Sequence, residues 1–154
     1  MIETPQIIQT SADHTAVIHL TVPRQEIHKV MGPAMQEVLA TVAAQGATRT
    51  GPLFAHHLRM QPDIFDLEVG VPVHAPFTPV GRVIASSLPA TRAARTVYRG
   101  GYHGLGAAWG AFDRWLQEQQ HRAAADLVER YARGPESSSN PDDWQTELIR
   151  PLAD

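Results

Sequence analysis

The feature that most constrains how this chain can fold is an internal repeat. Three segments in the first half return in the second half in the same order. Two of them return 74 residues later and the third returns 79 residues later, and a longer polar loop accounts for the difference. The matched segments are Met31-Gly-x-Ala-Met35 with Leu105-Gly-x-Ala-Trp109, Phe54-Ala-His-His57 with Val128-Glu-Arg-Tyr131, and Phe65-x-x-Glu68-x-x-x-Pro72 with Trp144-x-x-Glu147-x-x-x-Pro151. Three matches indicate that one structural unit has been duplicated.

The two halves also predict the same order of elements, which is strand, helix, strand, strand. Strands are expected where residues are β-branched or alternate apolar with polar, and helices where apolar residues recur every three or four positions. Pro33 lies inside the first helical pattern, so the first turn is irregular or the helix begins later. The expected elements are strands over 15–22, 51–60, 64–71, 91–98, 127–132 and 144–150, and helices over 26–46 and 102–120.

The length of 154 residues suits one domain with a real core. We expect that domain to span 1–154, with repeat one at about 15–73 and repeat two at about 91–152. The crossover at 74–90 is rich in proline and holds at most a short strand over 82–85. Residues 1–14 are expected to be a lead-in without regular structure.

Composition excludes several classes of function. The net charge is −3 and the arginines are scattered, so there is no basic footprint for nucleic acid. Cysteine is absent, which excludes disulfides, a thiol nucleophile and cysteine-bound metal. The N-terminus lacks the features of a signal peptide, and no apolar run reaches the ~20 residues of a membrane helix. We therefore expect a cytoplasmic protein that does not contact a membrane.

No motif points to a cofactor. There is no H-E-x-x-H among the eight histidines, and His56 and His57 are neighbours on a strand, so they point to opposite faces. The glycines of Gly100–Gly106 do not match G-x-G-x-x-G, and no P-loop lysine follows, since Lys29 is the only lysine. G-x-S-x-G is also absent. We expect no metal and no cofactor, and the glycines are interpreted as a tight turn that packs a helix closely on a sheet.

Six short motifs recur through the chain in a fixed order: Gly51-Pro-x-Phe54, Glu68-x-Gly-x-Pro72, Leu88-Pro-Ala, Tyr98-x-Gly-Gly-Tyr102 before a tryptophan-bearing helix, Glu129-x-Tyr131 and Glu147-x-x-x-Pro151. In these motifs the chain resembles the GyrI-like small-molecule-binding family, the effector-binding domain of AraC-type and MerR-type regulators. The resemblance covers about residues 16–152. The resemblance implies an α+β fold of two pseudo-symmetric βαββ repeats of SHS2 type. It also implies one curved antiparallel sheet, two helices on one face and a central cleft.

In this family the carboxylate that matches Glu129 lies in the cleft and faces cationic, aromatic ligands. Strand alternation puts Glu129 and Tyr131 on one face, and Val128 on the other face, where it would pack under a helix. By the repeat, His57 presents to the same cleft from the other half. The alternative is a surface Glu129 paired with Arg130 or Arg133.

Aromatic residues are the candidate walls of this site. Tyr98, Tyr102, Trp109 and Trp144 cluster around the motifs of the second half. Trp109 and Trp115 both lie on the apolar stripe of the predicted helix. We interpret Trp115 as core, and Trp109 remains open between a core residue and a ligand contact.

Three functions remain open at the level of sequence. The first is a stand-alone, multidrug-type binding protein for hydrophobic, aromatic or cationic molecules that sequesters toxic compounds. The second is implied by family members reported as hydrolases of cyclopropane-containing natural products, with Glu129 as general base and Tyr131, Tyr98 or His57 as donor. The third is a protein that acts by contacting a partner such as DNA gyrase. About fifteen residues precede the first repeat, too few for the regulators' helix-turn-helix, so we expect no direct binding of nucleic acid.

Overall fold

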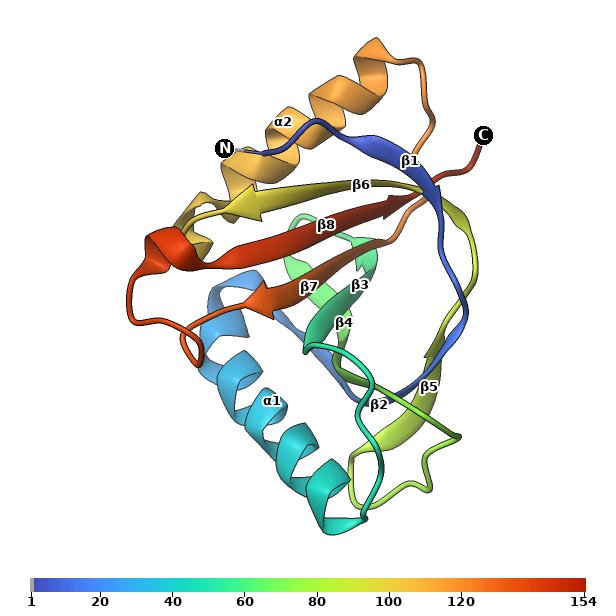
Figure 1. Cartoon of the computed structure of the whole chain (residues 1–154), viewed down its shortest axis with the longest axis vertical. Helices are drawn as coiled ribbons and strands as arrows, with labels where there is room; N and C mark the ends of the chain where they lie inside the picture. The colour runs from blue at the N-terminus through green and yellow to red at the C-terminus, as the bar shows by residue number, and fades with distance from the viewer. Residues whose placement is uncertain (1) are drawn as a thin grey trace. The chain divides into compact units, whose positions relative to one another are not determined.

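A computed structural model describes residues 2–154, except for the side chain of Met60. The fold class is α+β, as the sequence predicted, with antiparallel strands and two α-helices (Figure 1). The strands are β1 (Gln6–Gln9), β2 (Asp13–Pro23), β3 (Phe54–Met60), β4 (Ile64–Val73), β5 (Ile84–Leu88), β6 (Arg92–Arg99), β7 (Leu127–Arg133) and β8 (Gln145–Pro151). The helices are α1 (Ile27–Ala44) and α2 (Leu105–Glu118), and short 3-10 turns are η1 (Arg24–Glu26), η2 (Tyr102–Gly104) and η3 (Pro141–Asp143).

The chain forms two compact units, which we call the repeat-one unit (residues 11–90) and the repeat-two unit (residues 2–10 and 91–154). The order of strands is β3-β4-β2-β5 in the repeat-one unit and β7-β8-β6-β1 in the repeat-two unit. Neighbouring strands within each unit are antiparallel. Each unit thus contains the βαββ arrangement that the sequence predicted, with one further edge strand.

The strand register confirms the duplication at the level of single residues. Ala55 pairs with Val69 in the repeat-one unit, and Glu129 pairs with Leu148 at the corresponding place in the repeat-two unit. The buried helix positions also correspond, since Ala34, Val38 and Val42 of α1 match Ala108, Phe112 and Leu116 of α2. Both pairs of strands shift register at the same point, between His57 and Arg59 in β3 and between Arg130 and Arg133 in β7.

Two expectations about where the elements begin were wrong. The lead-in contains β1, which pairs with β6 at the edge of the repeat-two unit. The first helix begins at Ile27, ahead of Pro33, so the proposal of a later start is incorrect. With 18 residues, α1 is about one turn longer than the 14-residue α2, and Pro33 lies within it.

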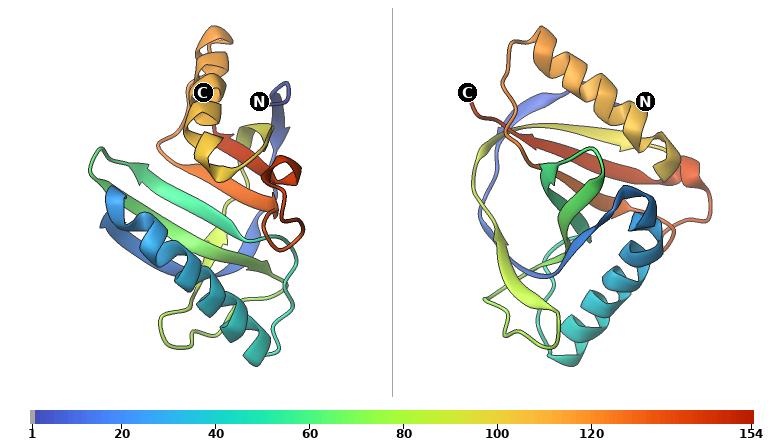
Figure 2. Two further views of the ribbon diagram at one scale, coloured as in Figure 1. Left: turned by 90° about the vertical axis from the view of Figure 1, so that its left-hand side faces the viewer. Right: turned by 180° about the vertical axis from the view of Figure 1, so that it is seen from behind.

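Each helix packs on the sheet of its own unit, as both views of Figure 2 show. Helix α1 packs mainly on β2 and β4, and α2 packs on β6 and against Leu148 of β8. The core of the repeat-two unit consists of Ala94, Tyr98, Ala108, Phe112, Leu116, Leu148 and Leu152. Within residues 2–154, neither helix combines the length and the apolar composition needed to cross a membrane.

Candidate functional site

The repeat-two unit holds a buried carboxylate between two aromatic donors. Glu129 lies on β7 with 9% of its surface exposed. The indole Nε1 of Trp109, on α2, donates a hydrogen bond of 2.7 Å to Glu129 Oε2. The phenol of Tyr131, two residues further along β7, donates one of 2.8 Å to Glu129 Oε1. Both carboxylate oxygens are therefore oriented by neutral groups.

The register of the sheet explains why this carboxylate meets α2. Glu129 pairs with Leu148 of β8, and directly paired residues of antiparallel strands share a face. Leu148 packs against the buried face of α2, so Glu129 lies on the helix-covered face. The expectation that Val128 packs under this helix is therefore wrong, because Val128 points to the other face. The shared face of Glu129 and Tyr131 agrees with the prediction from alternation. Glu129 is buried there and accepts hydrogen bonds from Trp109 and Tyr131.

An aromatic group extends from this carboxylate. The Tyr102 ring lies edge-on to Tyr131, with centroids 5.6 Å apart, and tilted against Trp144, with centroids 5.0 Å apart. Trp144 is fixed by a 2.9 Å hydrogen bond from its Nε1 to the carbonyl of Ser138. Tyr102 is 38% exposed, so part of this aromatic surface faces solvent. On the other side of the carboxylate, Trp109 stacks on Phe112 at 5.7 Å.

Tyr98 supports the turn that carries Tyr102. Its side chain is buried in the core, and its hydroxyl donates a 2.8 Å hydrogen bond to the carbonyl of Gly101. A Cβ at Gly104 would overlap the Tyr98 hydroxyl, so the turn can pack this closely only because glycine stands there. Tyr98 contacts the backbone of the glycine turn, which explains the close packing that the sequence predicted for it.

His57 belongs to the repeat-one unit. It is buried on β3, and its ring lies edge-on to Phe65 with centroids 5.2 Å apart. Its role as a ligand contact remains a prediction.

The electrostatics of the site keep its phenols protonated. Burial raises the pKa of Tyr131 well above its ordinary value of 10.0, and the nearby charge of Glu129 and the hydrogen bond to it act in the same direction. Burial also raises the pKa of Tyr102, helped by the charges of Glu136 and Glu129. Both side chains are thus neutral hydrogen-bond donors at physiological pH.

Sequence reasoning missed three contributors to this environment. Glu136 follows β7 and acts on Tyr102 through its charge. Gly134 is buried, and a Cβ there would lie 2.6 Å from the Tyr102 hydroxyl. Phe112 provides the surface on which Trp109 stacks. The Gly134-Pro-Glu136 sequence marks a turn directly after the Glu129-x-Tyr131 motif, which was the available signal for the first two.

The chemical groups that meet here are a carboxylate, two phenols and two indoles. Among residues 2–154, no group of three or more histidine, aspartate or glutamate side chains is placed to hold a metal ion. Such a set of groups can bind a cation through charge and through ring faces, and the carboxylate can accept a proton.

Comparison with models of known protein families identifies one family for this chain. A family model described as GyrI-like small molecule binding domain matches residues 3–153. No curated protein sequence matches the chain.

Solved structures share the fold. The EcmrR C-terminal domain has a TM-score of 0.83 at 19% identity, and the match covers 97% of this chain and 96% of that one. In the EcmrR–DNA complex the TM-score is 0.81 at 21% identity, and the match covers 98% of this chain but only 57% of the EcmrR chain. SAV2435 bound to tetraphenylphosphonium has a TM-score of 0.70 at 12% identity, with 97% and 94% covered. A hydrolase encoded by lin2189 from Listeria innocua has a TM-score of 0.63 at 12% identity, with 97% and 91% covered.

Proposed function

The chain belongs to the family of GyrI-like small molecule binding domains, and on that premise we propose that its ligands are hydrophobic, aromatic molecules that carry a positive charge. Glu129 is the group that faces the charge, and Tyr131, Tyr102, Trp109 and Trp144 supply aromatic surface around it. In this role the chain would hold such compounds tightly enough to sequester them.

The buried carboxylate of Glu129 carries this proposal. A carboxylate removed from water is costly unless a cation compensates its charge. Within residues 2–154, the hydrogen-bond partners of Glu129 are Trp109 and Tyr131, which orient the carboxylate without neutralising it. A bound cation would supply the missing charge, and a ring face beside it would add about 0.5–2 kcal/mol of cation–π attraction. The structure of SAV2435 with tetraphenylphosphonium supports a bulky aromatic cation as the probe.

The test measures the affinity of the full chain for tetraphenylphosphonium and for a neutral relative, triphenylphosphine oxide, by calorimetry. Glu129→Gln keeps the shape of the side chain and removes its charge, so we expect the affinity for the cation to fall by roughly tenfold or more. Glu118→Gln, an exposed position at the end of α2, is the matched control and leaves the affinity unchanged. Equal affinity of the wild type for the two probes would refute the role of charge.

A second candidate is hydrolysis of strained electrophiles such as cyclopropane-bearing natural products. One observation favours it. Glu129 could act as a base and Tyr131 as a donor, and the Tyr131 hydroxyl lies 2.8 Å from Glu129 Oε1. The similarity in fold to a hydrolase from Listeria innocua also supports it. In that reaction Glu129 would take a proton from water, the hydroxide would bond to a ring carbon, and the ring C–C bond would break. The electron pair released by that bond would then take up the proton that Glu129 holds, so that the net change is the addition of one water molecule.

Mass spectrometry separates the two candidates. A cyclopropane-bearing alkylator is incubated with the chain and the products are analysed for addition of water. Several ring-opened molecules per chain, lost in Glu129→Gln, would support hydrolysis. Retention of one intact molecule per chain would support binding alone.

A further inference from the structure

The repeat-one unit has its own counterpart of the aromatic group around Tyr102. Phe65 corresponds to Trp144 in the matched segments, and Arg24 and Tyr102 are both the first residues of the 3-10 turns that follow β2 and β6. The corresponding residues are also in contact: the Arg24 guanidinium carbon lies 4.4 Å from the Phe65 ring centroid, and the Tyr102 and Trp144 ring centroids lie 5.0 Å apart. Both repeats therefore have an aromatic ring at this place, Phe65 or Trp144. The residue that contacts the ring is the neutral Tyr102 in repeat two and the cation Arg24 in repeat one.

The guanidinium of Arg24 is fixed on two sides. Its Nε donates a 3.0 Å hydrogen bond to the carbonyl of Gln61, and its central carbon lies over the Phe65 ring. Among residues 2–154, neither terminal nitrogen of Arg24 has a hydrogen-bond or ion-pair partner. An arginine whose plane is already held loses little conformational entropy when it binds a carboxylate through those two nitrogens.

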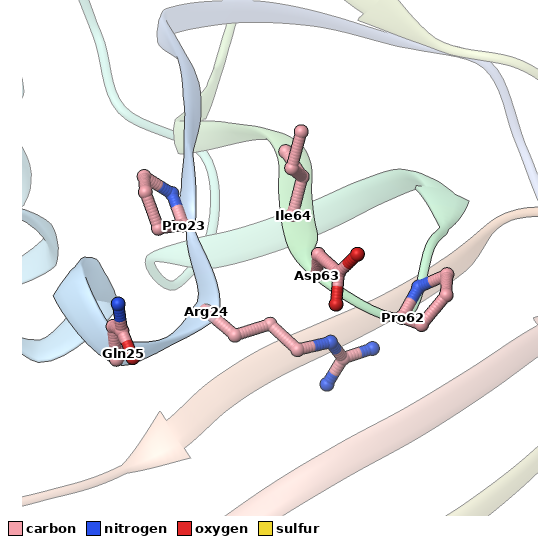
Figure 3. Close-up of a pocket in the computed structure, with 6 residues that line it drawn as sticks. All are labelled: Pro23, Arg24, Gln25, Pro62, Asp63 and Ile64. Atoms are coloured by element: carbon pink, nitrogen blue, oxygen red, sulfur yellow. The ribbon is translucent and has the colours of Figure 1, made fainter.

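Arg24 borders a surface hollow of about 670 Å³ (Figure 3). The hollow lies where the β2–β4 ladder ends at the Pro23–Ile64 pair. Its lining residues are Pro23, Arg24, Gln25, Pro62, Asp63 and Ile64. The prolines and Ile64, which is 38% exposed, provide apolar surface beside the one cation of this lining.

We infer that this hollow binds small monoanions that carry an aromatic or apolar body, with a carboxylate on the terminal nitrogens of Arg24. The apolar body would lie against Pro62 and Ile64. The carboxylate of Asp63 borders the same hollow and repels negative charge, so it selects against dianions such as phosphate. The inference concerns the repeat-one unit only, and it stands or falls independently of the function proposed for Glu129.

The experiment titrates benzoate into the ¹⁵N-labelled full chain and follows the arginine Nε–H resonances by NMR. We expect a saturable shift of the Arg24 resonance, with a dissociation constant on the order of 1–10 mM for a single arginine–carboxylate contact. Arg24→Gln, followed through the backbone amide resonances of the residues that line the hollow, should weaken the binding of benzoate by roughly tenfold or more. Asp63→Asn should strengthen it severalfold, because one repelling charge is lost.

Arg49→Gln is the matched control. Arg49 also donates from Nε to a backbone carbonyl, that of Gly51 at 2.7 Å, but it is exposed and does not line the hollow. Its replacement should leave benzoate affinity unchanged. The absence of a saturable Arg24 shift in the wild type would overturn the inference, and this result does not depend on whether any variant folds. Inorganic phosphate that binds as tightly as benzoate would overturn the assignment to monoanions.

Discussion

The indole Nε1 of Trp109 lies 2.7 Å from Oε2 of Glu129, although one residue is on a helix and the other on a strand 20 positions later. A tryptophan that packs against a core usually leaves its N–H to water or to a backbone carbonyl. Here the same side chain stacks on Phe112 and donates to a buried charge. Trp109 therefore packs with the core and also orients Glu129, and its role as a ligand contact remains a prediction.

Trp109→Phe should lower the free energy of unfolding by more than the loss of ring area alone. The variant keeps an aromatic ring but leaves one oxygen of a buried carboxylate without its donor, at a cost of about 1–3 kcal/mol. The comparison is with Trp115→Phe. Trp115 is also partly buried on α2, where it stacks on His121, and it makes no side-chain hydrogen bond among the described residues. Urea unfolding of both variants measures the difference, and equal losses would mean that the Trp109 hydrogen bond contributes nothing.

Tyr131→Phe should reduce the loss of stability that the protein shows at alkaline pH. The pKa of this phenol is raised, so the folded state favours its neutral form. Its contribution to stability is complete below the ordinary value of 10.0 and is lost as the pH rises through the higher folded value. Urea midpoints of the wild type should therefore fall above about pH 10, and those of Tyr131→Phe should fall less. At neutral pH the variant should lose about 1.5–3 kcal/mol, the net value of one hydrogen bond to a charged group. Identical alkaline profiles would contradict the assignment.

The sequence predicted the order of the elements because each has a local cause, such as β-branched runs, helical periodicity or glycine turns. It also placed Glu129 and Tyr131 on one face, since alternation along a strand is a local property. It could not predict which face α2 covers, because that depends on how β6, β8 and β7 pair. Val128 was therefore assigned to the wrong side.

The same limit applies to β1 and to Arg24. The segment Gln6–Gln9 has only four residues, and it becomes a strand through pairing with β6, more than 80 residues away. Arg24 follows a proline and looks like an ordinary surface arginine in the sequence. Its position on Phe65 depends on the pairing of β2 with β4, which no local pattern reveals.

Asp66 should make the protein sensitive to acid. Its buried carboxylate accepts a 2.5 Å hydrogen bond from His19 and two, of 3.2 and 3.0 Å, from Arg59. The hydrogen bond from His19 is the main reason that the pKa of Asp66 lies below its ordinary 3.8, against the opposing effect of burial. A lowered pKa gives stability that is present above the ordinary value and is lost as the pH falls through the folded value.

Unfolding at a series of pH values below about 4 tests this expectation. The wild type should lose stability in this range, and Asp66→Asn should lose less. At neutral pH Asp66→Asn should be less stable by about 1–3 kcal/mol, because its partners lose a charged acceptor. Asp63→Asn, an exposed position on the same hairpin, is the control and should follow the wild type. A wild-type profile that is flat below pH 4 would show that the network around Asp66 does not stabilise the fold.

Gly104→Ala and Gly110→Ala should change stability in opposite directions. A Cβ at Gly104 would overlap the hydroxyl of Tyr98, which is buried and held by the carbonyl of Gly101, so neither side can move freely. Overpacking of this kind costs about 1–3 kcal/mol of stability. It should also displace Tyr102 and so lower the affinity for tetraphenylphosphonium. Gly110 lies within α2, and the methyl group of an alanine there would meet no neighbouring atom within 4 Å. Alanine at this position should therefore stabilise the helix by about 0.5–1 kcal/mol. Thermal unfolding and calorimetry of the two variants measure both effects. A Gly104→Ala protein as stable as the wild type would mean that the glycine turn does not depend on its contact with Tyr98.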